Sequence, residues 1–442
     1  MRMRWILPSL AATLLATSGA IIAAESPAES TKPARCVSKS GTMIAQERTD
    51  RPWRSIEQGK EVPEKESIVA LPEASLDSGD GAIRVTALAD YEGKSPYPIL
   101  ETAFTLYTPT GESIDLELDR GRIDLLNIRK NGPATAEIRF ADEEWRVTLE
   151  EPNSQVSIER FGRWQSGARF AIKPTATDQP DVFVILIVRS GAISLETKRH
   201  RYRMTAPPGP ALLQWDSVSK MDAFPQRLDK LPEWAISDEK PSATTLTYRK
   251  ALEQFRQIRL EKGISEAVDA FYTSGDPIRE RIALVSMGAM DDLPRIGAAL
   301  SESRSAGIWD FGVVVARHWI GRGPGADQEL YQFLLNNRGF SVAHARTLME
   351  LLHGFSETTI HEPGCYELLI ELLKHERPAI RNLAGWHLHR LVPDLREKIP
   401  FKPNASPEES RRTYEAWKAA IPAGSVPPNV QSPREPAKGD RP

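Results

Sequence analysis

The sequence predicts an α+β protein of several domains, in which an antiparallel β-rich region precedes a helical one. Between about residues 53 and 220, apolar and polar residues alternate with a period of two, which is typical of half-buried strands. From about Leu246 the apolar residues recur at helical spacing. The 442 residues are 40% hydrophobic, enough for roughly two to three domains, each with its own core.

The N-terminus predicts export to the periplasm or beyond the cell. Two arginines within residues 1–4 precede an apolar stretch from Trp5 to Ile22, and small residues follow. This order is that of a signal peptide, residues 1–24, with cleavage near Ala20 or Ala24. The alternative is a retained membrane anchor, because the stretch nearly reaches the ~20 residues that a span needs. Its small and hydroxyl residues favour cleavage, and no other segment is apolar and long enough to span a bilayer.

Composition and periodicity divide the rest of the chain. The predicted units are a polar linker at 25–52, a β domain at 53–220, a connector at 221–245, a helical domain at 246–422 and a Pro-rich disordered tail at 423–442. Because the periodicity changes across the connector, we expect two separately folding units joined between about Pro207 and Thr245.

Two runs exemplify the β pattern. Ile114, Leu116 and Leu118 alternate with Asp115, Glu117 and Asp119, which places the two sets on opposite faces of a strand. Residues 182–188 are apolar on both faces and predict a central strand that is covered on both sides. Turn-forming residues separate the runs at short intervals, which indicates a sandwich, barrel or roll.

Three short motifs follow one another in the β region. They are LDRGRIDL at 118–125, the pair WRV and VSI at 145–147 and 156–158, and VRSGAISL at 188–195. They resemble the strand–glycine–strand step, the central hairpin and the closing V-x-x-G-x-V turn of the FecR domain of bacterial envelope regulators. The resemblance implies a FecR-like roll or sandwich. Because only four residues precede the apolar stretch and helices follow the β region, it implies the module and not the regulation of a sigma factor.

Four apolar stripes predict helices. PAIRNLA at 378–384 resembles the start of the second helix of a HEAT repeat, and PIRERIA at 277–283 does so more loosely. The stripes recur at intervals of about 30–40 residues, which suits paired helices. A non-repeating bundle would show similar stripes, so both arrangements stay open. The stripes are Tyr248/Ala251/Leu252/Phe255/Ile258, Ile308/Phe311/Val315/Ala316/Trp319, Leu348/Leu351/Leu352/Phe355 and Ile380/Leu383/Ala384/Leu388/Leu391.

No residue set predicts a catalytic, cofactor or metal site. The chain has neither a G-x-S-x-G elbow nor a G-x-x-x-x-G-K phosphate loop. Asp115, Glu117 and Asp119 could supply the acid and base of a glycosidase, but the solvated face of a half-buried strand is the favoured interpretation. His361 and Cys365 are too few to bind zinc and fall in an expected loop. His387 joins an apolar stripe and is expected to be a core histidine.

Three further features leave alternatives open. Cys36 and Cys365 could pair in an exported protein, although their assignment to different units favours unpaired thiols. The basic run at 198–203 fits either an anion-binding surface or a charged edge strand. Trp164 could stack on a sugar or lie in a core.

These patterns predict an exported binding or scaffold protein of the cell envelope without catalytic activity. Its expected partner is another envelope protein or a cell-surface polymer. Nucleic acid is not expected, because 57 basic and 60 acidic residues leave no basic excess. No cofactor and no stable membrane span after signal cleavage are expected. The alternative is an exported hydrolase that acts on polysaccharide with β-domain carboxylates, which would have to converge in one pocket.

Overall fold

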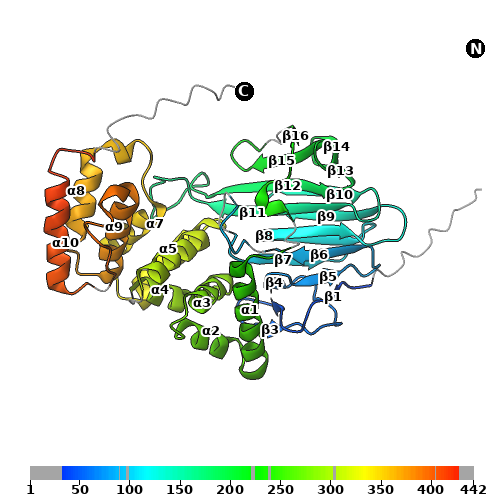
Figure 1. Ribbon diagram of the computed structural model, residues 1–442, viewed down its shortest axis with the longest axis horizontal. Coiled ribbons are helices and arrows are strands. Elements are labelled where there is room, and N and C mark those ends of the chain that lie inside the picture. Colours follow the sequence, from blue (N-terminus) through cyan, green and yellow to red (C-terminus); the bar gives the residue numbers. More distant parts are fainter. Residues whose placement is uncertain are drawn as a thin grey trace, which may run out of the picture. The chain divides into compact units, whose positions relative to one another are not determined.

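The computed structural model describes residues 32–88, 90–95, 99–220, 224–236, 240–301, 305–403 and 405–427. Within them, a mixed β-sheet region from Arg35 to Arg227 is followed by helices from Ala243 to Ala420 (Figure 1). This order confirms the predicted fold class. The predicted signal peptide and most of the predicted tail lie outside the described residues. The β region and the helices belong to one compact unit that begins at Lys32.

The β region contains sixteen strands within the described residues. They are β1 (Arg35–Cys36), β2 (Met43–Gln46), β3 (Arg54–Ser55), β4 (Ser67–Ala70), β5 (Ser75–Asp77), β6 (Ile83–Ala87), β7 (Thr102–Tyr107), β8 (Ile114–Asn127), β9 (Ala134–Phe140), β10 (Glu143–Leu149), β11 (Gln155–Arg163), β12 (Asp181–Ser190), β13 (Ala192–Glu196), β14 (Arg201–Thr205), β15 (Pro210–Asp216) and β16 (Gln226–Arg227).

The helical region contains ten α-helices within the described residues. They are α1 (Ala243–Lys262), α2 (Ile264–Tyr272), α3 (Pro277–Ala289), α4 (Leu293–Ser301), α5 (Ala306–Gly321), α6 (Ala326–Asn337), α7 (Val342–His353), α8 (Pro363–Leu372), α9 (Pro378–Leu391) and α10 (Pro407–Ala420). Short 3₁₀ turns lie at Glu233–Ala235, Thr359–His361 and Pro393–Leu395.

Two sheets share the long strand β8. One sheet runs β3-β2-β4-β7-β8-β9-β10-β13-β14 and the other β1-β5-β6-β8-β11-β12-β15-β16. Among the described strands, only β8 and β9 pair in parallel. Strand β8 passes from one sheet to the other near Gly121, whose φ is 93°. A Cβ there would lie 2.3 Å from the carbonyl oxygen of Glu101, so glycine permits both the bend and the close approach of the β7 segment.

The core of the β region lies between the two sheets. Leu116 and Leu118 of one sheet and Leu186 of the other belong to the same buried cluster, as the alternation predicted. On the opposite face of β12, Ile185 and Ile187 pack against Ala235 and neighbouring apolar residues of the segment before α1. The predicted central strand covered on both sides is therefore confirmed.

The structure corrects two expectations for the β region. The β region starts well before residue 53, because β1 and β2 lie inside the segment predicted as a linker. Their apolar runs are too short to stand out among polar neighbours, yet Met43, Ile44 and Ala45 are buried through pairing with β4. The motifs WRV and VSI do not form a hairpin, since β10 pairs with β9 and β13 whereas β11 pairs with β8 and β12.

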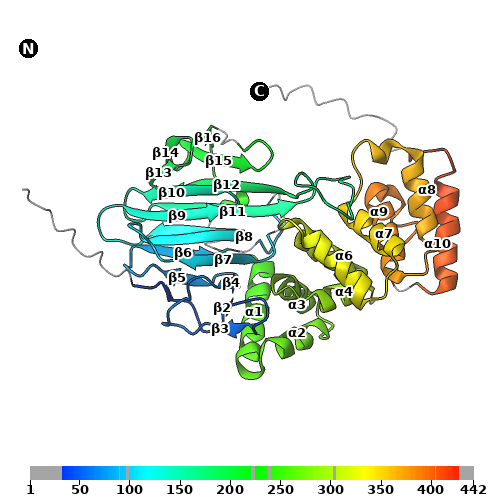
Figure 2. The same ribbon diagram turned by 180° about the vertical axis from the view of Figure 1, so that it is seen from behind.

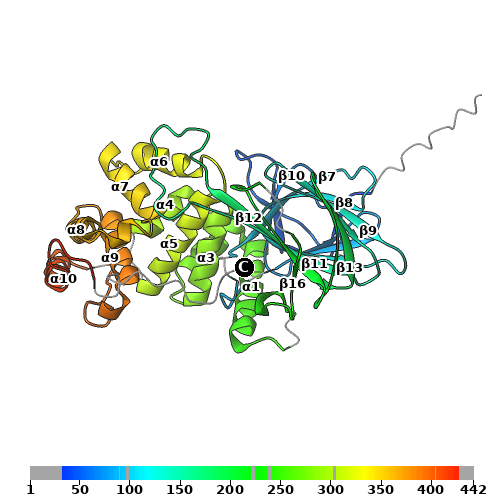
Figure 3. The same ribbon diagram turned by 90° about the horizontal axis from the view of Figure 1, so that it is seen from above.

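The helices stack in pairs. Helices α2, α4, α6 and α8 each contact the helix that follows, and α3, α5, α7 and α9 contact one another in turn. Figures 1 and 3 show the helices progressing away from the β region towards α10, and Figure 2 shows α6 beside α4. Both HEAT-like motifs begin helices, α3 and α9, with proline in the first turn. Whether they form a HEAT repeat stays a prediction.

One expected loop in the helical region is instead the start of a helix. The proline and glycine within residues 361–365 predict a loop there. Helix α8 begins at Pro363, since proline lacks only an N–H that is unpaired in the first turn anyway. Among the described helices, none combines the length and the apolar character needed to cross a membrane.

The connection between β11 and β12 docks on the helices. The indole Nε1 of Trp164 donates to the carbonyl oxygen of Ile320 at 2.9 Å, and its ring stacks on His353. A Cβ on Gly162 would lie 2.4 Å from the carbonyl oxygen of Gly321, so backbone meets backbone at this point. This interface therefore joins the β region to the helices in addition to the connector. Whether the two fold separately stays a prediction.

Candidate functional site

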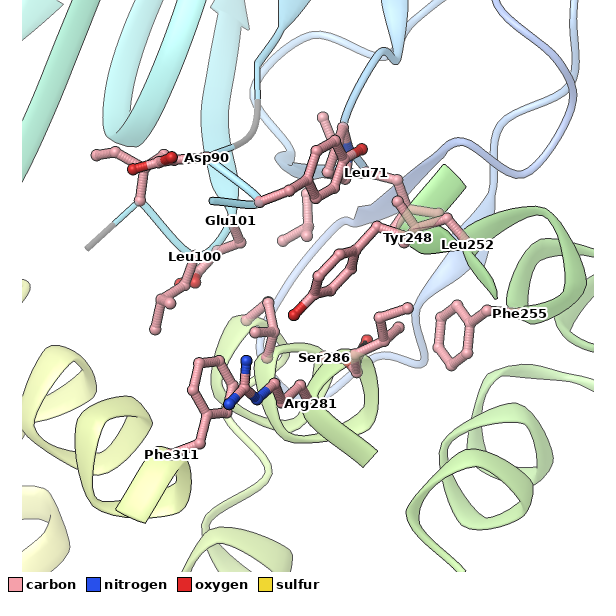
Figure 4. Close-up of a pocket in the computed structure, with 18 of the residues that line it drawn as sticks. Leu71, Asp90, Leu100, Glu101, Tyr248, Leu252, Phe255, Arg281, Ser286 and Phe311 are labelled. Carbon is pink, nitrogen blue, oxygen red and sulfur yellow. Dashed lines mark hydrogen bonds between the residues drawn. The ribbon is translucent and has the colours of Figure 1, made fainter. Parts of the chain in front are cut away.

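A cavity of about 550 Å³ lies between the β region and helices α1, α3 and α5 (Figure 4). We call it the interdomain cavity. Side chains such as Leu71 and Leu100 line it from the β region, and Leu252, Phe255 and Phe311 line it from the helices. Its volume falls within the ~300–1,000 Å³ of small-molecule sites, which are mostly apolar with a few placed polar groups.

Helix α1 supplies one wall of the cavity. The helix begins after Ser242, whose hydroxyl accepts a hydrogen bond from the N–H of Thr245 at 3.1 Å. The stripe that follows turns towards the β region. Phe255 is buried, whereas Tyr248 and Leu252 are partly buried at the cavity. The ring of Tyr248 stacks on Tyr91 with centroids 5.1 Å apart, which joins α1 to the segment between β6 and β7.

A buried ion-pair network holds the β region to α3 and α5 beside the cavity. Oε1 of Glu101 accepts from Nε of Arg120 at 2.7 Å and lies 3.3 Å from Nε2 of His318. Nη2 of Arg120 donates to the carbonyl oxygen of Ala289 at 3.0 Å, at the last residue of α3. Burial raises the pKa of Glu101, but His318 and Arg120 outweigh it and hold that pKa at about 2. Glu101 is therefore an ionised anchor rather than a proton donor near neutral pH.

The other carboxylates that line the cavity also have partners. Asp90 accepts from the backbone N–H groups of Lys94 at 2.9 Å and Ser95 at 2.7 Å, which closes a turn. Glu92 forms an ion pair with Nζ of Lys94 at 2.9 Å and accepts from the hydroxyl of Thr245 at 3.2 Å. Negative charge at the cavity is thus already compensated.

Two arginines at the cavity lack such compensation. Arg259 of α1 is only 5% exposed, and no described residue accepts a hydrogen bond from its Nε or Nη2. Burial, with a contribution from neighbouring Arg256, lowers the pKa of Arg259 to about 9. Arg281 of α3 lies over the ring of Phe311 at 5.2 Å, and its buried Nε likewise has no acceptor among the described residues. Figure 4 shows Arg281 and Tyr248 reaching into the same space from α3 and α1.

The carboxylates considered for a hydrolase do not line this cavity. Nε and Nη2 of Arg139 donate to both oxygens of Asp115, each at 2.8 Å. Glu117 accepts from the hydroxyl of Tyr107 at 2.8 Å. Asp119 is half exposed and contacts Nη1 of Arg120. The three therefore lie on one strand with separate partners, and the structure does not bring them together with Glu101 in one pocket.

The histidine and cysteine expectations have clear outcomes. His387 is buried, its Nε2 lies 2.7 Å from the carbonyl oxygen of Leu351, and burial lowers its pKa to about 3, which confirms a core histidine. Cys36 and Cys365 form no disulfide and are buried in the β and helical cores respectively. His361 is exposed, and no cluster of three potential metal ligands occurs within the part of the chain that the structure describes.

The basic run 198–203 and Trp164 have structural roles. The basic run 198–203 leads into β14, the last strand of its sheet, where Arg201 pairs with Glu196 and Arg203 with Glu150. These pairs fit the charged edge-strand interpretation. Trp164 lies in the interface with α5 and α7 and is only partly exposed, so its ring is not available as a sugar platform.

The residues that line the cavity could not be predicted from the sequence. The walls of the cavity come from segments far apart in the chain. The periodicity of a sequence does not show which apolar stripes will leave a gap where they meet. One signal was present in the sequence: Arg259 follows Phe255 by four residues, so a cation occupies the apolar face of α1. Comparisons with protein-family models, curated proteins and solved structures gave no match.

Proposed function

We propose that this protein is an exported binding protein of the cell envelope that holds a largely apolar ligand in the interdomain cavity. The observation that carries the proposal is the cavity itself, which is of small-molecule size and lined mainly by apolar side chains from both regions. A space of this size within well-packed surroundings forfeits packing energy unless a ligand occupies it.

The polar groups at the cavity support binding rather than chemistry. Glu101 is held ionised by two partners, and the hydroxyl of Ser286 donates to the carbonyl oxygen of Ile282 at 2.8 Å within its own helix. A hydrolytic nucleophile would instead need a base within hydrogen-bond reach. A protein or polymer partner, the kind expected from the sequence, would have to insert an apolar group small enough to enter.

Export and a FecR-like β module complete the proposal. The order of charged, apolar and small residues at the N-terminus supports export. Two glycines with positive φ support the likeness to the module. Gly121 lies at the bend of β8, and Gly191 lies in the turn between β12 and β13. N-terminal sequencing of the protein from an envelope fraction tests export. A chain that retains Met1 in the cytoplasm would contradict it.

Titration with the uncharged fluorophore N-phenylnaphthylamine tests the binding function. We expect saturable fluorescence enhancement with one site per chain. Ser286→Trp, which fills the cavity from α3, should abolish it. Thr247→Trp, at an exposed position of α1, is the matched control and should leave binding unchanged. Absence of saturable binding to the unmodified protein, or equal binding by the Ser286→Trp variant, would refute the proposed function.

A further inference from the structure

The charges around the interdomain cavity are out of balance. Its carboxylates, Asp90, Glu92 and Glu101, all have hydrogen-bond donors or cations within the chain. Arg259 and Arg281 have guanidinium nitrogens from which no described residue accepts a hydrogen bond. A buried cation without an acceptor is costly. Arg259 is such a cation, and half-buried Arg281 adds a second positive charge whose Nε is unpaired, so the site favours a ligand that brings negative charge.

The unpaired atoms also indicate the shape of the anion. Nε and Nη2 form one edge of a guanidinium, and this edge binds the two oxygens of a carboxylate side by side. The chain uses it in this way elsewhere: Nε and Nη2 of Arg84 donate to Asp77 at 2.7 and 2.9 Å, and those of Arg139 to Asp115. In Arg259 the same two atoms lack an acceptor.

We propose that the ligand of the interdomain cavity is an amphiphile with a carboxylate head and an apolar body, recognised by Arg281 and Arg259. The inference rests on the proposed function and specifies its ligand class. Arg281 extends into the cavity and meets the head, while Arg259 supplies a second positive charge from the wall. Nε and Nη2 of Arg259 are buried in the ligand-free protein, so they reach a carboxylate by a change of side-chain rotamer. The apolar body packs against residues such as Leu252 and Phe311.

Competition for bound N-phenylnaphthylamine tests the inference. The competitors are dodecanoate, dodecanol and dodecyl phosphate, which share one chain and differ in the head. We expect dodecanoate to displace the fluorophore at concentrations at least about tenfold lower than dodecanol, because hydrogen bonds to charged groups contribute that much or more. Arg281→Gln and Arg259→Met should each reduce this preference. Arg279→Gln is the matched control, because Arg279 lies outside the cavity, with Nη2 donating to Gln254 at 2.9 Å.

The possible results of the competition experiment distinguish the inference from the proposed function. Equal displacement by dodecanoate and dodecanol would overturn the inference and leave the proposed function standing. Tighter binding of dodecyl phosphate than of dodecanoate would overturn the assignment of a carboxylate. Loss of the preference in Arg279→Gln as well would show that the effect is not local to the cavity and would also overturn the inference. If the fluorophore itself fails to bind, the proposed function falls and the inference with it.

Discussion

Replacing Arg259 with methionine should make the ligand-free protein more stable. The guanidinium is buried without an acceptor among the described residues, and burial lowers its pKa from the ordinary value of an arginine to about 9. A difference of that size corresponds to about 5 kcal/mol of unfavourable free energy for the charged form. Methionine keeps an unbranched apolar stem, so we expect a part of this, about 1–4 kcal/mol, as added free energy of unfolding.

Urea unfolding followed by circular dichroism measures the effect. The variant should show a higher midpoint at pH 7 with an unchanged slope. The folded pKa of Arg259 lies below the unfolded one, so the unfolded chain binds more protons above pH 9 and stability of the unmodified protein rises there. The advantage of methionine should therefore shrink as the pH increases beyond 9.

A matched change separates this effect from general repacking. Arg279→Met removes a guanidinium that donates to Gln254 and lies over the ring of Phe271, and it should lower the free energy of unfolding by about 0.5–1.5 kcal/mol. If Arg259→Met also lowers the midpoint, Arg259 is a satisfied structural residue and the reasoning about uncompensated charge is wrong.

Three further predictions concern the frame around the cavity. Glu101→Gln should lower the free energy of unfolding by about 3–5 kcal/mol at pH 7. Because the folded pKa of Glu101 is about 2, this difference from the unmodified protein should vanish in acid unfolding as the pH falls from 4.5 through 2. Gly121→Ala should shift the urea midpoint far more than Gly132→Ala, since both glycines have positive φ but only Gly121 has backbone atoms in the way of a Cβ. His387→Leu should remove a loss of stability that sets in as the pH falls from 6.5 towards 3, because folding keeps this histidine neutral; an unchanged pH profile of the melting temperature would contradict that.

The fold could be predicted from the sequence where one face of an element decides its burial. The alternation around Leu116 and the doubly apolar run of β12 both led to the correct strands, since a period of two leaves few alternatives. The two HEAT-like motifs also coincide with helix starts at Pro277 and Pro378, where proline suits the first turn.

Pairing and the site could not be predicted because they depend on partners distant in sequence. β10 and β11 are neighbours in the chain but enter different sheets, so a motif of two adjacent strands suggested a hairpin that does not form. The short β2 is held by β4 rather than by its own composition. The contact of Glu101 with His318 joins residues 217 positions apart, and no periodic pattern encodes that approach.

The most direct test of a binding function in the interdomain cavity is a crystal structure of the protein with a bromine-labelled dodecanoate. We expect anomalous density for the bromine inside the cavity, among the apolar side chains of α1, α3 and α5, with the carboxylate at the guanidinium of Arg281. A cavity without ligand density in crystals that hold dodecanoate elsewhere on the surface would contradict the account.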